Sequence, residues 1–256
     1  MKKIWFLLLT VVFIFGNYIL NFLAIGGRSI GDSADAFRTL LSPADFTFSI
    51  WGVIFAALLY IGSVIAFTNK TVPAQILSAY TVVVGLLLGW IFLWQNSYLL
   101  LSAIVLVAAT VLNFFIVNSF RRSYRGPSKF FGACTQLYLI FATWTLVASV
   151  INVTTWLRYG EVFSWIISLD WPQWVWASGV VGLLGFVSLI LMWRMRYITF
   201  WAVYLWTLWG LNAVSGSTPE LYTTVQYCLL GVGILGAVIW SVYGSISPSR
   251  LNKTPS

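Results

Sequence analysis

The residues of this sequence best suited to a function are aromatic side chains that recur at helical spacing. Phe48, Trp51 and Phe55 are three and four positions apart, so in a helix they lie on one face. Trp90 and Trp94 form a second pair, four positions apart. Aromatic walls suit a flat, apolar molecule. The spacing therefore predicts binding of a planar hydrophobic ligand.

A third aromatic set occurs further along the chain, where Phe141, Trp144, Ala148 and Asn152 share one stripe of a predicted helix. If the helices alternate in direction across a membrane, Ala148 comes to the depth of Trp51. A small residue opposite a large one leaves a slot. We therefore expect a pocket between the three helices.

Two cations lie in the connection 26–45, which we expect to cover this pocket. Arg28 and Arg38 are placed to pair with carboxylates of a ligand. An alternative explains the same residues without a ligand: the aromatic rings only pack the helices together, and the arginines are solvated.

The chain lacks the side chains that most other mechanisms use. It has no histidine, which excludes a His-ligated metal or haem and the Ser-His-Asp and Cys-His triads. Its six carboxylates show no spacing that indicates acid–base chemistry. We therefore predict no enzyme activity, no catalytic residue, no metal and no cofactor.

The elements that position these residues are membrane helices. The chain has 256 residues, of which 60% are hydrophobic and 8% charged, against roughly 25% charged in soluble domains. Apolar runs long enough to cross a bilayer lie at roughly 4–25, 46–68, 75–95, 98–119, 130–153, 173–193, 197–214 and 220–243. We expect an all-α, polytopic membrane protein with about eight transmembrane helices, the seventh being the shortest.

Charges between these spans predict the topology. With a cytoplasmic N-terminus, eleven of the fourteen Lys and Arg residues fall inside, and all six Asp and Glu residues fall outside. The positive-inside rule expects this sorting. The net charge of +8 is therefore assigned to topology, so the predicted partner is the lipid bilayer and not a nucleic acid. Both termini are predicted to be cytoplasmic, and the aromatic pocket is predicted to lie near the outer face.

Two segments of the sequence resemble the TspO/MBR family, the tryptophan-rich sensory proteins or translocator proteins. One is the aromatic run from Ser42 to Phe55, which is similar to the family's proline-led entrance to its second helix. The other is the Trp, Ala and Asn of the predicted fifth helix at intervals of four. Phe141 stands where the family usually has Tyr, and Tyr138 lies one turn earlier.

The resemblance implies a five-helix TspO-like bundle over residues 1–155 that binds tetrapyrroles or sterol-like molecules under its first long loop. It also implies a sensing or translocating role, in a bacterial plasma membrane. The rest of the chain is predicted to form an external interfacial segment at 156–172, three additional transmembrane helices at 173–245 and a cytoplasmic tail at 246–256.

Two other functions stay open. A permease for a small hydrophobic solute would use uncharged polar residues in the spans, namely Asn17, Asn113, Gln136, Asn212 and Gln226. A non-catalytic accessory subunit would use its last three helices to dock a partner. Glycine-rich helix faces are also compatible with a homo-oligomer.

Overall fold

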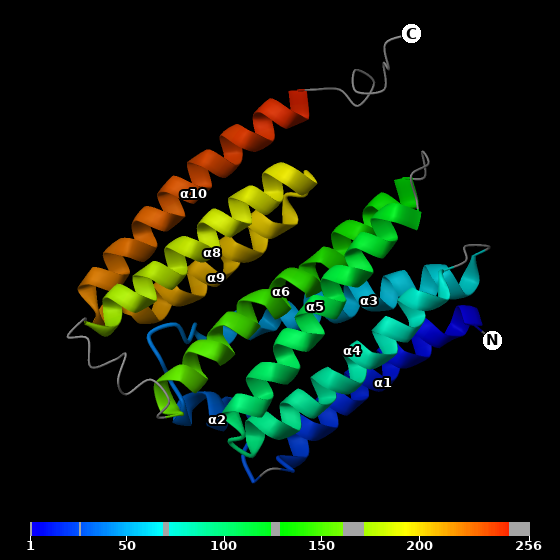
Figure 1. Cartoon of the computed structure of the whole chain (residues 1–256), viewed down its shortest axis with the longest axis horizontal. Coiled ribbons are helices and arrows are strands. Elements are labelled where there is room, and N and C mark those ends of the chain that lie inside the picture. The colour runs from blue at the N-terminus through cyan, green and yellow to red at the C-terminus, as the bar shows by residue number, and fades with distance from the viewer. Residues whose placement is uncertain (1, 26, 69–71, 124–128, 161–171, 246–256) are drawn as a thin grey trace.

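The architecture was obtained as a computed structural model (Figure 1), which describes residues 2–25, 27–68, 72–123, 129–160 and 172–245. Every regular element within these ranges is helical, as the sequence predicts. Most of the predicted interfacial segment, 161–171, and the predicted tail, 246–256, lie outside the described residues.

Eight longer helices build the described part of the molecule. They are α1 (Lys2–Leu23), α3 (Ile50–Phe67), α4 (Ala74–Gln95), α5 (Leu99–Ser123), α6 (Lys129–Tyr159), α8 (Gln173–Met195), α9 (Thr199–Val214) and α10 (Pro219–Ser245). Three short elements join them: α2 (Ile30–Ala36) and the 3-10 helices η1 (Asp45–Ser49) and η2 (Ser215–Ser217). Helix α2 was not predicted, because its residues fall in the connection 26–45.

Seven of the long helices in the described part are long and apolar enough to cross a membrane, which confirms a polytopic membrane protein. The exception is α9, the shortest predicted span. Its 16 residues extend about 24 Å, less than the roughly 30 Å of a bilayer's hydrocarbon core. Much of α9 is buried between α6, α8 and α10, so this helix is stabilised mainly by its protein neighbours.

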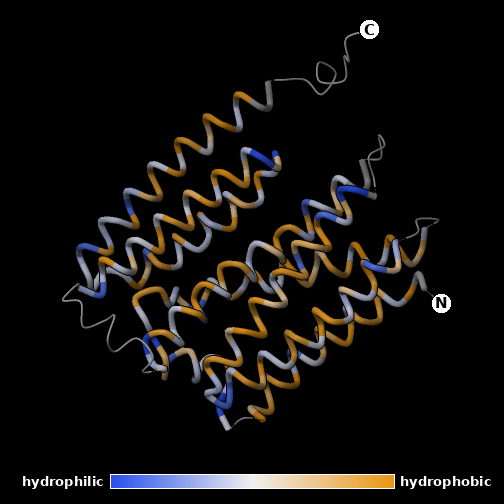
Figure 2. The backbone as a smooth tube through the Cα atoms, in the orientation of Figure 1, coloured by the Kyte–Doolittle hydropathy of each residue, from blue (hydrophilic) through white to orange (hydrophobic). Residues whose placement is uncertain are grey.

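The two ends of the helix bundle differ in charge. Figure 2 shows apolar residues along the helices and hydrophilic ones near their ends. One end, here called the acidic end, carries α2, η1 and every described carboxylate, namely Asp32, Asp35, Asp45 and Glu220. The opposite, basic end carries Arg121 and Arg122 of α5 and Arg194 of α8. The start of α1 and the end of α10 also lie at the basic end (Figure 1).

Two apolar cores hold the helices together. The larger one fills the bundle of α1, α3, α4, α5 and α6, and includes Phe13, Tyr80 and Trp144. The smaller one lies among α8, α9 and α10 and includes Leu41 from the connection between α2 and η1. The two cores meet through α9, which packs against α6 and stacks Phe200 on Phe114 of α5. The five-helix bundle and the last three helices therefore form one packed body.

Residues 27–45 of the connection are folded over the acidic end. Its helix α2 begins with a capping box, in which Ser29 and Asp32 each accept a hydrogen bond from the other's backbone N–H. At the far end, the hydroxyl of Tyr159 in the last turn of α6 donates to the Arg38 carbonyl at 2.7 Å. Because α6 runs to Tyr159, six residues beyond the predicted end at 153, its last turn reaches this connection.

Ser42, Pro43 and Asp45 carry the sequence signal of a helix start, because Pro43 suits a first helical turn and the two polar side chains suit its capping, but the regular helix does not begin there. Pro43 precedes η1, and the regular helix α3 begins at Ile50. Neither Ser42 nor Asp45 caps it, because Ser42 Oγ instead accepts a hydrogen bond from the Thr39 amide at 3.0 Å. The backbone just before η1 is instead hydrogen-bonded to another helix, because the Ala44 amide donates to the Gly210 carbonyl of α9 at 3.1 Å.

Candidate ligand-binding pocket

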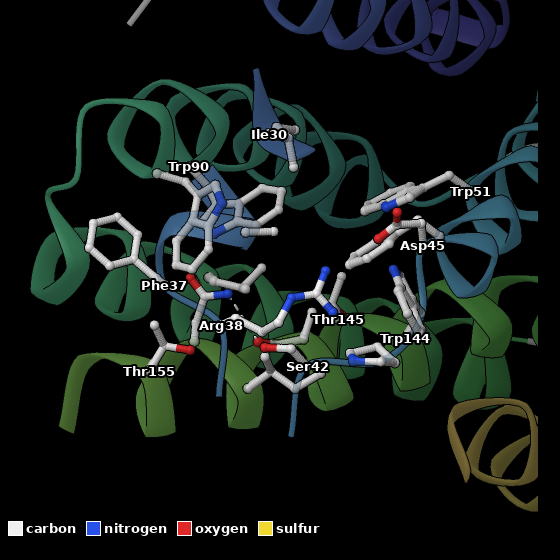
Figure 3. Close-up of a pocket in the computed structure, with 18 residues that line it drawn as sticks. Ile30, Phe37, Arg38, Ser42, Asp45, Trp51, Trp90, Trp144, Thr145 and Thr155 are labelled. Carbon is white, nitrogen blue, oxygen red and sulfur yellow. Dashed lines mark hydrogen bonds between the residues drawn. The ribbon is translucent and has the colours of Figure 1, made fainter. Parts of the chain in front are cut away.

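A cavity lies at the acidic end, under the connection 26–45 and between α3, α4 and α6 (Figure 3). Six aromatic side chains contribute to its lining: Phe37, Phe48, Trp51, Trp90, Trp94 and Trp144. Three helices and the connection supply them, so residues over a hundred positions apart in the chain meet around one space.

Eight of the twelve residues that the sequence analysis named lie around this cavity. They are Arg38, Phe48, Trp51, Trp90, Trp94, Trp144, Ala148 and Asn152. The other four, Arg28, Phe55, Tyr138 and Phe141, do not line it.

Three of those four residues form the layer beneath the cavity. Phe55 and Phe141 pack against Trp51, with ring centroids 5.6 and 6.1 Å away, and against Phe13 of α1. Tyr138 is fully buried one turn deeper and touches Phe141. These three residues lie on the predicted helix faces but too far from the acidic end to line the cavity. They pack beneath its aromatic wall and support it.

Arg28 is also away from the cavity. It lies exposed just before α2, at the opposite end of that helix from Arg38. Its charge acts on Asp32, whose pKa is held below the ordinary value mainly by the hydrogen bonds from Ser29. Arg28 therefore belongs to the start of α2 and does not reach the proposed ligand.

One side of the cavity is built by α3, η1 and the middle of α6. Phe48 meets Trp144 edge-on, with centroids 6.0 Å apart. Trp51 lies one turn along, and Asp45 lies between Trp51 and Trp144 in the view of Figure 3. The local fold explains this placement, because the 3-10 turn of η1 directs Phe48 toward α6 before α3 begins at Ile50.

The opposite side is held by hydrogen bonds. Trp90 Nε1 donates to Asn152 Oδ1 at 3.0 Å, and Ser102 Oγ donates to the same oxygen at 3.3 Å. Phe37 packs edge-on against both Trp94 and Tyr159. The Asn152 oxygen is therefore used to join α4, α5 and α6, which fixes the Trp90 ring as a wall.

Three indole N–H groups of the lining have no acceptor. Trp90 donates to Asn152, but within the described part of the chain no hydrogen bond is formed by the indoles of Trp51, Trp94 or Trp144. Trp144 is only 1% exposed. A buried indole normally finds a partner, so these groups are donors available to a ligand in the cavity.

The cavity also carries charge on its outer side. The Arg38 side chain extends between the two walls in Figure 3 and is hydrogen-bonded to Asp35. This bond raises the pKa of Arg38, with a smaller contribution from the charge of Asp45. Arg38 is therefore a permanent cation at the cavity. Among the described residues, no group of three His, Cys, Asp or Glu side chains is placed to hold a metal ion.

The cavity is narrow as it stands. The cavity volume is about 60 Å³, enough for a few water molecules. A flat molecule of tetrapyrrole size needs more room. The floor of the cavity is made of packed helices, and its outer side is the connection 37–45.

Several lining residues were not found from the sequence. Ile151 and Thr155 extend the stripe of Trp144 and Ala148 at helical spacing, so the same periodicity could have found them. Thr145 is a neighbour of Trp144 and accepts a hydrogen bond from Asn113 Nδ2 at 3.2 Å. Phe37 had no such signal, because it follows a short helix inside a polar connection.

Comparison with known proteins gives one match. The model of a family described as TSPO-like protein matches residues 3–241, nearly the whole chain. The match includes α8, α9 and most of α10, so it extends well beyond the 1–155 region in which the sequence motifs were recognised. No curated protein matches the chain. No solved structure matches it either.

Proposed function

Because the chain belongs to the TSPO-like protein family, we propose that it binds a planar hydrophobic molecule, such as a tetrapyrrole or a sterol-like compound, in the pocket under the connection 26–45. One observation carries the proposal: eight residues selected for aromatic spacing and charge surround the same cavity. Such convergence is not required for helix packing alone. The proposed role is binding, for sensing or translocation, without catalysis.

The chemistry of the lining favours a flat ligand that bears a carboxylate. Its faces would lie against Trp51, Trp90 and Trp144, where ring contacts add about 0.5–1.5 kcal/mol each beyond area burial. Arg38 and the unpartnered indole N–H groups would meet the carboxylate. A sterol, which has one hydroxyl, would leave most of these donors unused, so a porphyrin with propionate groups fits better.

Binding would couple to movement of the connection 37–45. Two contacts hold its first residues, 37 and 38, over the cavity: the Tyr159 hydroxyl donates to the Arg38 carbonyl, and the ring of Phe37 packs on Trp94. A ligand large enough to fill the pocket would displace at least one of them. That change gives a sensor a signal at the membrane surface.

The proposed orientation follows from the charged ends. The protein is an integral membrane protein, and the positive-inside rule assigns its basic end to the cytoplasm. The pocket would then open at the outer face of a bacterial plasma membrane, with both termini inside.

Titration of protoporphyrin IX into protein in lipid nanodiscs tests the binding, with quenching of tryptophan fluorescence as the signal. The variant Trp51→Ala/Trp144→Ala removes two walls of the pocket, whereas Trp240→Ala removes a lipid-exposed ring of α10. We expect the double variant to lose saturable quenching and the control to keep it. Equal quenching by the wild type and the double variant would exclude this site.

Translocation is the second candidate, and it rests on polar groups that continue below the cavity. Thr145 lines the pocket, and Asn113 joins it to the Tyr138 hydroxyl, which donates to Asn113 Oδ1 at 2.7 Å. The pair Asn212 and Gln226, by contrast, bridges α9 and α10. Flux of the porphyrin into proteoliposomes separates the functions: binding without flux favours a sensor.

A further inference from the structure

The last helices of the chain are in direct contact with the segment that forms the rim of the cavity. We define the rim segment as residues 42–48, which precede and enter η1. On the side away from the cavity it lies against α9. The Ala44 amide donates to the Gly210 carbonyl at 3.1 Å, and Trp206 Nε1 donates to the Thr47 carbonyl at 2.9 Å. Both bonds join backbone of the rim segment to one helix.

The contact is close enough to require a glycine. A Cβ atom at Gly210 would overlap Thr47 Oγ1 and would lie 3.0 Å from both Thr47 Cβ and Pro43 Cβ. Real Cβ atoms rarely approach other atoms at 3.0 Å, so any side chain would push the rim segment away. The Thr47 hydroxyl itself is buried without a hydrogen-bond partner, so its role here is to fill space.

Aromatic packing extends the same contact. Phe46 meets Trp206 edge-on, with centroids 5.8 Å apart, and meets Trp209 at 5.3 Å. Both tryptophans belong to α9. The rim segment is therefore fixed to α9 by two hydrogen bonds, a close glycine contact and a cluster of three rings.

The opposite side of the rim segment faces the cavity. Pro43, Asp45 and Phe48 line it, and Phe48 touches Trp144 across it. Seven consecutive residues thus have α9 on one side and the proposed ligand site on the other. A shift of the segment on α9 moves four lining residues together, since Ser42 also lines the cavity.

We propose that α9 is a clamp that sets the position of the cavity rim and thereby the affinity for ligand, with Gly210 and Trp206 as positioning residues. The inference rests on the proposed function for its link to ligand, but the clamp itself is a property of the unliganded protein. It assigns a role to the C-terminal helices that does not depend on a separate partner.

Hydrogen exchange of the unliganded protein in nanodiscs tests the clamp. Gly210→Ala is expected to speed exchange of the amides in residues 42–49 by roughly tenfold, because overpacking displaces the segment. Gly231→Ala is the matched control, since an added Cβ there meets nothing within 4 Å. Unchanged exchange in α5 shows that the variant has folded.

A compensating substitution separates positioning from general damage. Thr47→Ala removes the hydroxyl that the new Cβ would overlap and, because this hydroxyl has no partner, is expected to be nearly neutral alone. The double variant Gly210→Ala/Thr47→Ala should recover part of the wild-type exchange, because the overlap with Thr47 Oγ1 is removed while the 3.0 Å contacts with the Cβ atoms of residues 43 and 47 remain. Trp206→Phe keeps an aromatic ring at this position but removes the indole N–H that donates to the Thr47 carbonyl. This variant should therefore speed exchange less than Gly210→Ala does.

Protoporphyrin IX titrations of the same variants test the link to binding. We expect Gly210→Ala to weaken binding by roughly tenfold and the double variant to restore it in part. Unchanged exchange at 42–49 in Gly210→Ala would overturn the clamp, and faster exchange with wild-type affinity would overturn its control of the site. If the wild type does not bind the porphyrin, the proposed function fails, and the exchange data alone decide whether the clamp exists.

Discussion

Trp90 of α4 donates a hydrogen bond from its indole nitrogen to Asn152 Oδ1 of α6, across 3.0 Å in the wall of the cavity. Ser102 of α5 donates to the same oxygen, so one buried amide joins three helices. Asn152 is only 5% exposed. The bond makes the Trp90 ring a fixed wall and gives Asn152 a structural role at the site.

Asn152→Ala should therefore lower the free energy of unfolding. Hydrogen bonds between membrane helices contribute about 0.6 kcal/mol on average and at most about 1.7. Here the buried Trp90 indole loses its acceptor, whereas Ser102 keeps the Leu99 carbonyl at 2.8 Å. We expect a loss of about 1–2 kcal/mol, measured by denaturation in mixed micelles. Asn96→Ala is the control, since Asn96 is only partly buried and its side-chain amide donates to the Phe92 carbonyl in the last turn of the helix that it follows. Equal stability of the two variants would contradict the assigned role.

Arg38→Gln should weaken binding of protoporphyrin IX by about fivefold, because a charge-assisted hydrogen bond is lost at a partly solvated site. Binding of the dimethyl ester, which lacks carboxylates, should be unaffected. Arg28→Gln serves as the control, because Arg28 comes from the same connection but lies away from the cavity. The role of Arg38 is refuted if ester and free acid respond alike to its substitution.

The helical part of the fold was predictable because its signal is local. Charge-free apolar runs set the spans, and the sorting of charges set their alternation. The start of α3 was not predictable from the sequence. Ser42 and Pro43 carry a helix-start signal, but the contact of this segment with Gly210 overrides it. That contact joins residues more than 160 positions apart, and no spacing within either segment reports it.

The sequence predicted which helix faces form the site, but not how deep the cavity extends along them. Phe55, Phe141 and Tyr138 lie on the expected faces, yet the cavity ends above them. Phe37 contributes through the fold of the connection, which periodicity does not describe. Helical periodicity could therefore find residues of regular helices, whereas it gave no signal for Phe37, which the fold of the connection places.

The capping box of α2 predicts an acid dependence. Hydrogen bonds from Ser29 hold the pKa of Asp32 below its ordinary value of 3.8, so the ionised carboxylate is favoured in the folded state. This contribution is present above pH 3.8 and is lost as the pH falls through the lower, folded value. The difference in melting temperature between the wild type and Asp32→Ala should shrink on acidification in that window. A difference that grows as the pH falls would contradict it.

Close packing of α1 on α3 predicts a stability effect at Gly62. An added Cβ would lie 3.0 Å from the Leu7 Cα, which is backbone and unable to yield freely. Gly62→Ala should therefore cost about 1–3 kcal/mol of stability. Gly52→Ala, in the same helix with nothing within 4 Å, should be neutral or slightly stabilising because alanine favours helix. Indistinguishable unfolding curves for the two variants would show that α1 is not seated on α3 as described.

The central claim is that a planar ligand binds between α3, α4 and α6 and not elsewhere on the apolar surface. A second apolar cavity, between α5 and α6, is lined by Val107, Phe114, Leu146 and Val153 among others, and offers an alternative location. Photo-crosslinking of a diazirine-bearing porphyrin to protein in nanodiscs, followed by peptide mass spectrometry, reports which cavity is occupied. We predict labels within residues 37–51 and on the Trp144 to Thr155 face of α6, competed by unmodified porphyrin. Competed labels confined to the second cavity, with none around Trp51 and Trp144, would contradict the account.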